Sequence, residues 1–326
     1  SAEHLDAIVK AIPGTPSLYG LDDTSELLSH LYDSSTGNWT EHDDVYITYH
    51  SGPKVREFNY MVQGPLSVGY GVREERIGPE LGFGWRMRDL LSDDNDDVEI
   101  YIIKVAWGGA SLNADFRSPS SGINTERMEP LEGYGWAYET LVDHVRDTLD
   151  NITNIVPNYD PAVGYTLEGL VFFQGFNDVL QWSFIDEYQS NLENFVQDFR
   201  DDLNEPDLNV VIGELGMHGR LEPNCPTLVS GLCPVDPLCG CCDFPYFCDR
   251  VSTLRAIQRM VAENDDNVGF AETGKYNYGH IKDSSHPEYK QPWTTEHSSH
   301  YYMNADAHYF MGESMAEAMY DLMTNP

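Results

Sequence analysis

The chain has 326 residues, of which 54 are acidic and 19 are basic, and its formal net charge is −35. Such a surplus of carboxylates is repelled by the phosphates of nucleic acids and of anionic lipids, which argues against both as partners. No run of about 18 apolar residues occurs, so we expect no membrane-spanning segment.

Short apolar runs alternate along the chain with longer amphipathic stretches, which predicts alternating strands and helices. The predicted strands are Val45–Tyr49, Val98–Ala106, Leu170–Phe173, Leu208–Leu215 and Val268–Glu272, and the predicted helices are Ile77–Leu91, Tyr134–Leu149, Phe184–Leu203, Val251–Glu263 and Asn304–Met323. Continuous apolar strands are typical of a parallel sheet covered on both faces. Because no repeat or linker divides the sequence, we expect one α/β domain over residues 1–326.

Residues 222–250 form a cysteine-rich insertion between the predicted strands Leu208–Leu215 and Val268–Glu272. It holds every cysteine of the chain: Cys225, Cys233, Cys239, Cys241, Cys242 and Cys248. An even number of cysteines in one Pro- and Gly-rich loop predicts local disulfides and an oxidising compartment. Zinc is the alternative, although two clean C-x-x-C pairs and a histidine within the cluster are lacking. The sequons at Asn38 and Asn151 also agree with secretion and glycosylation.

Two acidic runs, Asp93–Asp97 and Glu263–Asp266, are candidates for Ca²⁺ binding. They lack the alternating ligand spacing of a calcium loop, so we interpret both runs as acidic surface exposed to solvent rather than as Ca²⁺ sites. The loop before the last helix contains His280, His286, His297 and His300 without H-x-H or H-E-x-x-H spacing. We therefore predict neither a metal site nor another cofactor.

Two polar turns follow buried strands. Trp107–Leu112 follows the strand that ends at Ala106, and Gln174–Asp178 follows the strand that ends at Phe173. Open α/β sheets bind ligands at the carboxyl ends of their strands. A side-chain amide there, such as that of Asn177, can stabilise a developing oxyanion. The alternative is a pair of tight turns in which Asn and Asp cap backbone groups.

Four stretches of the sequence carry a family resemblance: IGPELGFG (Ile77–Gly84), KVAWGGASL (Lys104–Leu112), FFQGFND (Phe172–Asp178) and HYYMNADAHYFMGESMAEAM (His300–Met319). With ADFRSPSSG (Ala114–Gly122), they resemble the sialate O-acetylesterase / carbohydrate acetylesterase branch of the SGNH (GDSL-like) hydrolases. The resemblance covers roughly residues 20–323 apart from the cysteine insertion. It implies a three-layer α/β/α sandwich with a parallel, flavodoxin-like sheet and serine-dependent hydrolysis of acetyl esters.

The resemblance also implies roles for individual residues. Gly109 and Asn177 would stabilise the oxyanion, and His300 would act as the base, with His308 as a rival inside the last helix. The candidates for substrate contact are Arg117, Ser111, Gln174 and Asp178. A structural ion pair at Arg117 and turn capping by Ser111 remain open.

The nucleophile of the family lies in a Gly-Gln-Ser-Asn turn after the first strand, and this sequence contains neither the turn nor that strand. Three explanations are open. The strand belongs to another polypeptide or lies outside these residues, or Val45–Tyr49 or another segment takes its place in the sheet. In the third, the protein is a non-catalytic relative of the family. Ser51 is a replacement nucleophile without the family motif around it. The acid partner is also open: Glu296 and Asp178 are candidates, because His297 occupies the usual position.

These observations predict a secreted, extracellular O-acetylesterase-like serine hydrolase that acts on acetylated carbohydrate. The alternative is a non-catalytic protein of the same fold that binds glycans or serves in an extracellular assembly. If the protein is the hydrolase, an N-terminal fragment or another subunit is its expected partner.

Overall fold

The computed structural model describes residues 28–51, 60–71, 76–92, 98–123, 133–157, 159–217, 248–277, 301 and 305–325. Its strands are β1 (Tyr32–Asp33), β2 (Asn38–Trp39), β3 (Val45–Ser51), β4 (Tyr60–Pro65), β5 (Ile100–Val105), β6 (Gly169–Phe172), β7 (Asn209–Gly213) and β8 (Val268–Ala271). Its α-helices are α3 (Glu80–Ser92), α4 (Trp136–Asp150), α5 (Ile152–Ile155), α6 (Trp182–Leu203), α8 (Cys248–Glu263) and α9 (Ala305–Thr324). The predicted elements are therefore confirmed, with bounds that differ by a few residues.

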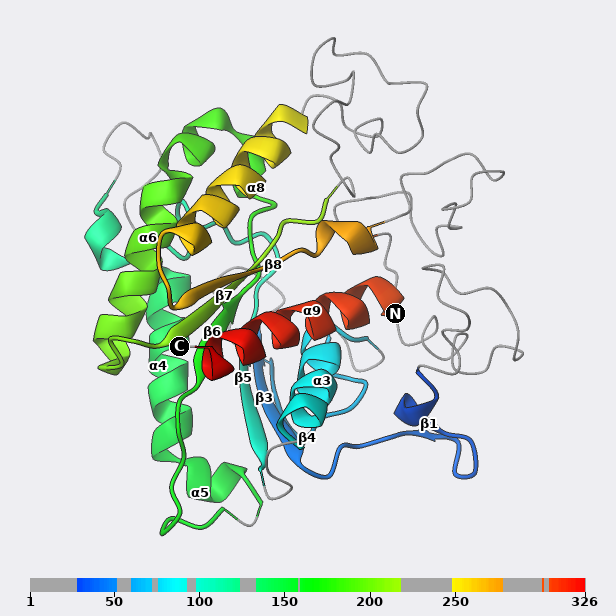
Figure 1. The fold of residues 1–326 in the computed structure, drawn as a ribbon. Helices are drawn as coiled ribbons and strands as arrows, with labels where there is room; N and C mark the ends of the chain where they lie inside the picture. The colour runs from blue at the N-terminus through cyan, green and yellow to red at the C-terminus, as the bar shows by residue number, and fades with distance from the viewer. Residues whose placement is uncertain are drawn as a thin grey trace, which may run out of the picture.

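Helices cover the strands from two sides and give the expected three layers (Figure 1). Strand β7 shows why helices pack on both faces: its side chains point alternately to the two faces of the sheet. Val210 and Ile212 belong to the core formed with α4, α6 and α8, whereas Val211 packs in a second core with α3 and α9. All three side chains are fully buried, as an interior strand covered on both faces requires.

The strands form two separate three-stranded sheets and a small β1–β2 pair. Strands β6, β7 and β8 are parallel to one another, while β3 pairs in parallel with β5 and antiparallel with β4. Within the described residues β5 and β6 do not pair, so the single flavodoxin-like sheet of the sequence prediction is confirmed only in part. The apolar pattern of a strand reports burial and not which strand it pairs with, which is why the sequence could not show this division.

Strand β3 occupies an interior position of its sheet. Val45 lies opposite Ile100 of β5, and His50 lies opposite Val105. The other edge of β3 pairs with β4, in a register that sets Ile47 opposite Gly64. Strand β3 thus lies directly beside β5, and β4 covers its other edge.

Helices α3 and α9 approach each other closely at glycines. A Cβ on Gly82 would lie 1.9 Å from the carbonyl oxygen of Tyr309, and one on Gly312 would lie 2.0 Å from that of Pro79. Both distances are far below a van der Waals contact, so only glycine fits at these two positions. These glycines of the family-like motifs therefore serve helix packing.

Several sequence predictions lie outside the described residues. They concern His300, the acid candidate Glu296, the Asp93–Asp97 run and the cysteine insertion at residues 222–250 up to the start of α8. In the part of the chain that the structure does describe, no helix is long and apolar enough to cross a membrane.

Candidate active site

The two predicted oxyanion donors lie next to each other, although 68 positions separate them in the sequence. Gly109 follows β5 and has a φ of +84°, a left-handed conformation that favours glycine. A Cβ built on Gly109 would lie 3.7 Å from Nδ2 of Asn177, which follows β6. Gly109 is exposed and Asn177 is half-buried, so a ligand can reach both.

The amide of Asn177 makes no hydrogen bond to another described residue. As far as the described residues are concerned, its two N–H groups are therefore available to a ligand. Amide donors that are already in place can stabilise the negative charge of a tetrahedral intermediate in ester hydrolysis. The structure thus brings together the two groups named for that task, and the task itself stays a prediction.

Asp178 fixes the two turns relative to each other. It is fully buried, and its carboxylate accepts hydrogen bonds from the backbone N–H groups of Leu112 and Asn113, both at 2.9 Å. The amide of Gln174 donates a third bond at 2.6 Å. Burial raises the pKa of Asp178 to about 6, although the three hydrogen bonds on their own would lower it. Asp178 therefore holds the glycine turn against the turn after β6, and its predicted contact with substrate or base stays a prediction.

Gln174 connects the same two turns from the other side. Its Nε2 also donates to the carbonyl oxygen of Ala110 at 3.2 Å, while its Oε1 is buried without a hydrogen-bond partner in the described structure. Its backbone carbonyl accepts from Gln258 at 3.1 Å and from the Tyr188 hydroxyl at 3.3 Å. Gln174 therefore links the two turns, and its predicted contact with substrate stays a prediction.

Ser111 caps the turn that contains Gly109. Both its backbone N–H and its Oγ bond to Oδ2 of Asp115, at 2.8 and 3.1 Å, and Oγ accepts from the N–H of Ala114. The other oxygen of Asp115 accepts from the indole of Trp136 at 2.7 Å. With 4% of its surface exposed, Ser111 fits the turn-capping reading of the sequence.

All three nitrogens of the Arg117 guanidinium bind groups of the protein itself. Nη1 forms an ion pair of 2.8 Å with Glu187 and also donates to the carbonyl of Asn113. Nε and Nη2 donate to the carbonyls of Gly122 and Ser121. The structure therefore supports the ion-pair reading of Arg117, and a contact with substrate stays a prediction.

A buried polar cluster lies beyond the carboxyl end of β7, and sequence reasoning missed it. Glu214 accepts from the N–H of Gly274 at 2.7 Å and lies 4.0 Å from the guanidinium of Arg255. Arg255 donates to the carbonyl of Met217 at 2.6 Å, and Tyr301 accepts from the N–H of Gly216 at 3.0 Å. A Glu directly after a buried strand was the available signal, since that is where parallel sheets place functional groups.

Tyr301 also shows where the last loop returns to the described structure. Its ring lies 6.0 Å from that of Phe173, just after β6, and 5.6 Å from that of His308 in α9. Tyr301 directly follows the predicted base His300 in the sequence. Tyr301 therefore lies beside the carboxyl ends of β6 and β7.

The remaining candidates are placed as follows. The backbone of Ser51 ends β3 beside the carboxyl end of β5, and Asn38 and Asn151 are exposed. Asp265, from the second acidic run, forms an ion pair of 2.6 Å with Arg200. Among the described residues no group of three or more His, Cys, Asp or Glu side chains is arranged to hold a metal ion.

Comparison with known proteins gives one family match. The family model described as "Carbohydrate esterase, sialic acid-specific acetylesterase" matches residues 51–228, more than half of the chain. The match contains the turns of Gly109 and Asn177 and ends within the cysteine insertion. No curated protein matches the sequence.

Two solved structures are similar to this one at low sequence identity. A protein from Arabidopsis thaliana has 14% identity and a TM-score of 0.48, with 90% of each chain covered. A carbohydrate acetylesterase from Xanthomonas citri has 12% identity and a TM-score of 0.45, over 88% of this chain and 51% of that one. This chain thus spans about half the length of the second protein. Both similarities are weak, so the family assignment rests on the sequence match.

Proposed function

Because this chain belongs to the carbohydrate esterase, sialic acid-specific acetylesterase family, we propose that it hydrolyses acetyl esters of carbohydrates by serine chemistry. One observation supports this function above the others: Gly109 and the Asn177 amide lie side by side, at 3.7 Å from the Cβ position of the former to Nδ2 of the latter. In the proposed site these two donors, which follow β5 and β6, stabilise the oxyanion of the tetrahedral intermediate.

In the proposed reaction a serine oxygen forms a bond to the acetyl carbon while its proton passes to the imidazole of His300. The carbonyl oxygen becomes an oxyanion that accepts from the Gly109 N–H and the Asn177 amide. Collapse breaks the bond to the sugar oxygen, which takes the proton from the histidine. Water then attacks the acetyl-serine with the same histidine as base, and acetate leaves as the serine regains its proton.

We place the serine on a segment outside the 326 residues, because the sequence contains no Gly-Gln-Ser-Asn turn. Labelling with a fluorophosphonate and mapping by mass spectrometry tests this placement on protein isolated from its source. The expected label lies on a co-purifying or covalently attached segment. A label on Ser51 would instead identify the nucleophile within this chain. Absence of label, with an intact mass equal to these 326 residues, would refute the enzyme and favour the non-catalytic alternative.

The oxyanion assignment has its own test. Replacing Asn177 with Ala should lower kcat for an O-acetylated sugar by roughly 10² to 10³, the usual effect of losing one such donor, with an unchanged melting temperature. Asn154→Ala is the matched control, since Asn154 is an exposed asparagine on α5. Equal activity of the two variants would exclude Asn177 from catalysis.

We further propose that the protein is secreted and acts on extracellular glycans. The exposed sequons at Asn38 and Asn151 and the predicted disulfides of the cysteine insertion support this location. Digestion with an N-glycosidase should lower the mass of protein isolated from its source. Mass unchanged by digestion, together with six cysteines that react with iodoacetamide without reduction, would refute secretion.

A further inference from the structure

An exposed aromatic ring follows the turn that contains Asn177. Trp182 begins α6, and 45% of its surface is accessible to solvent, as is 41% of the surface of Leu180. Gln181 and Ser183 are exposed as well, so residues 180–183 form a continuous open surface. A single exposed apolar side chain needs no explanation by itself, and the position of Trp182 is what indicates a role.

The chain holds Trp182 close to the candidate oxyanion site. Between Asn177 and Trp182 lie the 3-10 turn Asp178–Leu180 and the extended residue Gln181. Two backbone N–H groups of the turn donate to the carbonyl oxygen of Gly175, at 3.1 and 3.2 Å. With rises of about 2 Å per residue in a 3-10 turn and about 3.3 Å in extended backbone, the Cα atoms of Asn177 and Trp182 are roughly 13 Å apart or less. A sugar ring whose acetyl group lies at Asn177 is therefore within reach of the indole.

Arg250 of α8 fixes this surface. Its Nη1 donates to the carbonyl oxygens of Val179 at 3.3 Å and of Leu180 at 2.5 Å. The guanidinium carbon lies 5.7 Å from the centre of the Trp182 ring, which is a cation–π distance. Helices α6 and α8 lie side by side, so these contacts join two elements of the scaffold (Figure 1). The protein therefore holds the indole in place while nearly half of its surface stays open to a ligand.

The charges around the ring favour an uncharged ligand. Asp186 is exposed and lies one turn after Trp182 on α6, a spacing that places both side chains on the same side of the helix. Asp249 is exposed too, in the first turn of α8 and directly before Arg250. In a chain with a net charge of −35, these carboxylates repel a sugar acid and leave a neutral sugar unaffected.

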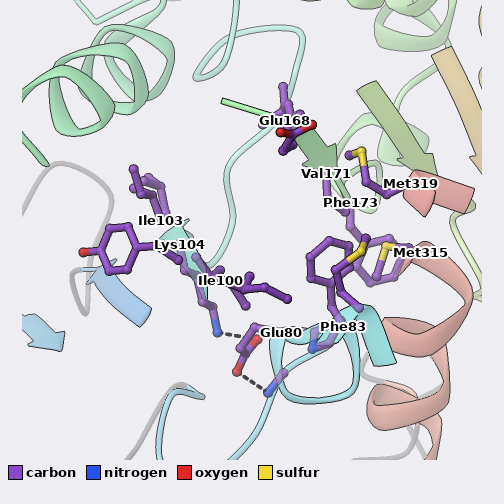
Figure 2. A pocket seen from close by; sticks show the side chains of 18 of the residues that line it. Glu80, Phe83, Ile100, Ile103, Lys104, Glu168, Val171, Phe173, Met315 and Met319 are labelled. Atoms are coloured by element: carbon purple, nitrogen blue, oxygen red, sulfur yellow. Dashed lines mark hydrogen bonds and ion pairs between the residues drawn. The ribbon is translucent and has the colours of Figure 1, made fainter. Parts of the chain in front are cut away.

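Two cations near the site are balanced by the protein itself. Lys104, near the carboxyl end of β5, forms an ion pair of 2.8 Å with Glu80 (Figure 2). Arg117, in the loop after β5, forms one of 2.8 Å with Glu187. Neither cation therefore needs the carboxylate of a sugar acid to balance its charge.

We propose that Trp182 is the stacking platform for the ring of an uncharged, acetylated pyranose. The axial C–H groups of one face of the sugar lie against the indole, because their weak positive charge suits the negative face of the aromatic ring. The acetyl group of the same sugar extends to Gly109 and Asn177. The position of the acetyl group rests on the proposed function, whereas the stacking of the ring does not.

Binding without catalysis is the first test, by saturation-transfer NMR with millimolar methyl β-glucoside as the probe. We expect the transfer to concentrate on the three axial C–H groups of one ring face. Trp182→Phe should keep this pattern and Trp182→Ala should abolish it. The matched control is Tyr165→Ala, since Tyr165 is an exposed aromatic residue before β6, at the other end of that strand from Asn177. No transfer in the wild type, or equal transfer in Trp182→Ala, would overturn the proposal.

A matched sugar acid tests the role of charge. Methyl β-glucuronide has the same ring with a carboxylate in place of the hydroxymethyl group, and at low ionic strength it should bind about fivefold more weakly. Asp186→Lys should remove most of this preference, whereas Asp207→Lys, at an exposed position before β7, should keep it. A preference that Asp186→Lys leaves unchanged would place the ring elsewhere. Equal or tighter binding of the glucuronide to the wild type would refute an uncharged substrate and identify Arg250 as a partner of the carboxylate.

Hydrolysis then connects the platform to the proposed function. For methyl tetra-O-acetyl-β-glucoside, Trp182→Ala should raise KM by about tenfold with little change in kcat, while Trp182→Phe should stay close to the wild type. The same variants should hydrolyse glycerol triacetate, which has no ring, as the wild type does. Equal losses for both esters would show that Trp182 only supports the site and would overturn the proposal. If the wild type hydrolyses neither ester, the proposed function fails, and the binding of methyl β-glucoside still decides the platform.

Discussion

Asp178 accepts a hydrogen bond of 2.9 Å from the backbone N–H of Leu112, and this contact joins the turn after β5 to the turn after β6. A second bond, from the N–H of Asn113, has the same length. The carboxylate thereby sets the distance between Gly109 and Asn177, which extend from the two turns. The geometry of the candidate oxyanion site thus depends on the buried carboxylate of Asp178.

Replacing Asp178 with Ala should destabilise the protein by about 3–5 kcal/mol, since three buried donors lose their acceptor at once. Urea unfolding measures this loss. Asp201→Ala is the control, because Asp201 lies exposed on α6 and its carboxylate accepts a bond only from Gln197 among the described residues. Its stability should stay within about 0.5 kcal/mol of the wild type. If both variants unfold at the same urea concentration, Asp178 does not hold the two turns together.

The raised pKa of Asp178, at about 6, predicts the direction of a pH effect. An acid whose pKa is higher in the folded state stabilises the fold most below its unfolded pKa of about 4, and this contribution disappears as pH rises through about 6. As the pH increases from about 4 to about 7, the stability of the Asp178→Asn variant should therefore rise relative to that of the wild type, as urea titrations at several pH values would measure. A difference that is constant over this range would refute the raised pKa.

Gly312→Ala should destabilise the contact between α3 and α9 by about 2–3 kcal/mol. The new methyl group would lie 2.0 Å from the carbonyl oxygen of Pro79 and 2.6 Å from the backbone nitrogen of Phe83, and backbone atoms cannot rotate away as a side chain can. Gly108→Ala provides the comparison, because a Cβ there meets no atom within 4 Å. Thermal unfolding of the two variants should separate them, and equal melting temperatures would show that the helices adjust freely.

The ion pair between Lys104 and Glu80 predicts strong non-additivity. Glu80 is 6% exposed and accepts from the Gly78 N–H at 2.8 Å, so Lys104→Met leaves a buried carboxylate without its cation. We expect a loss of about 3–5 kcal/mol for Lys104→Met. The double variant Lys104→Met with Glu80→Gln should recover a large part of it, as a double-mutant cycle in urea would measure. Additive losses would mean that the pair contributes little.

The sequence predicted that Gly109 and Asn177 lie close together, because each follows an apolar strand and the family resemblance gave both the same task. Their roles in catalysis stay a prediction. Long-range polar contacts were not predictable, since Arg117 and Glu187 are 70 positions apart and nothing in either segment indicates the other. The burial of Asp178 was hidden for the same reason: an Asp after a strand reads equally well as a cap, a ligand or a support.

The histidine pair His50 and His144 gives a last prediction, on stability in mild acid. Their Nδ1 atoms lie 3.3 Å apart between the end of β3 and helix α4. Burial lowers the pKa of both rings, and for His144 burial together with the neighbouring His50 lowers it to about 4, against a smaller opposing effect of Asp147. Two protonated rings would direct N–H groups and positive charge at each other, so the folded state keeps the pair neutral.

The sign of the effect follows from proton binding. Between pH 6.5 and 4 the unfolded chain protonates His144 while the folded protein does not, so stability falls as the pH falls. We expect a loss of about 1–2 kcal/mol at about pH 5 relative to about pH 7 from this residue. His144→Gln should remove the larger part of the slope and His50→Gln a smaller part, in urea titrations at several pH values. Parallel slopes in the wild type and His144→Gln would contradict the neutral, buried pair, because the slope would then come from other groups.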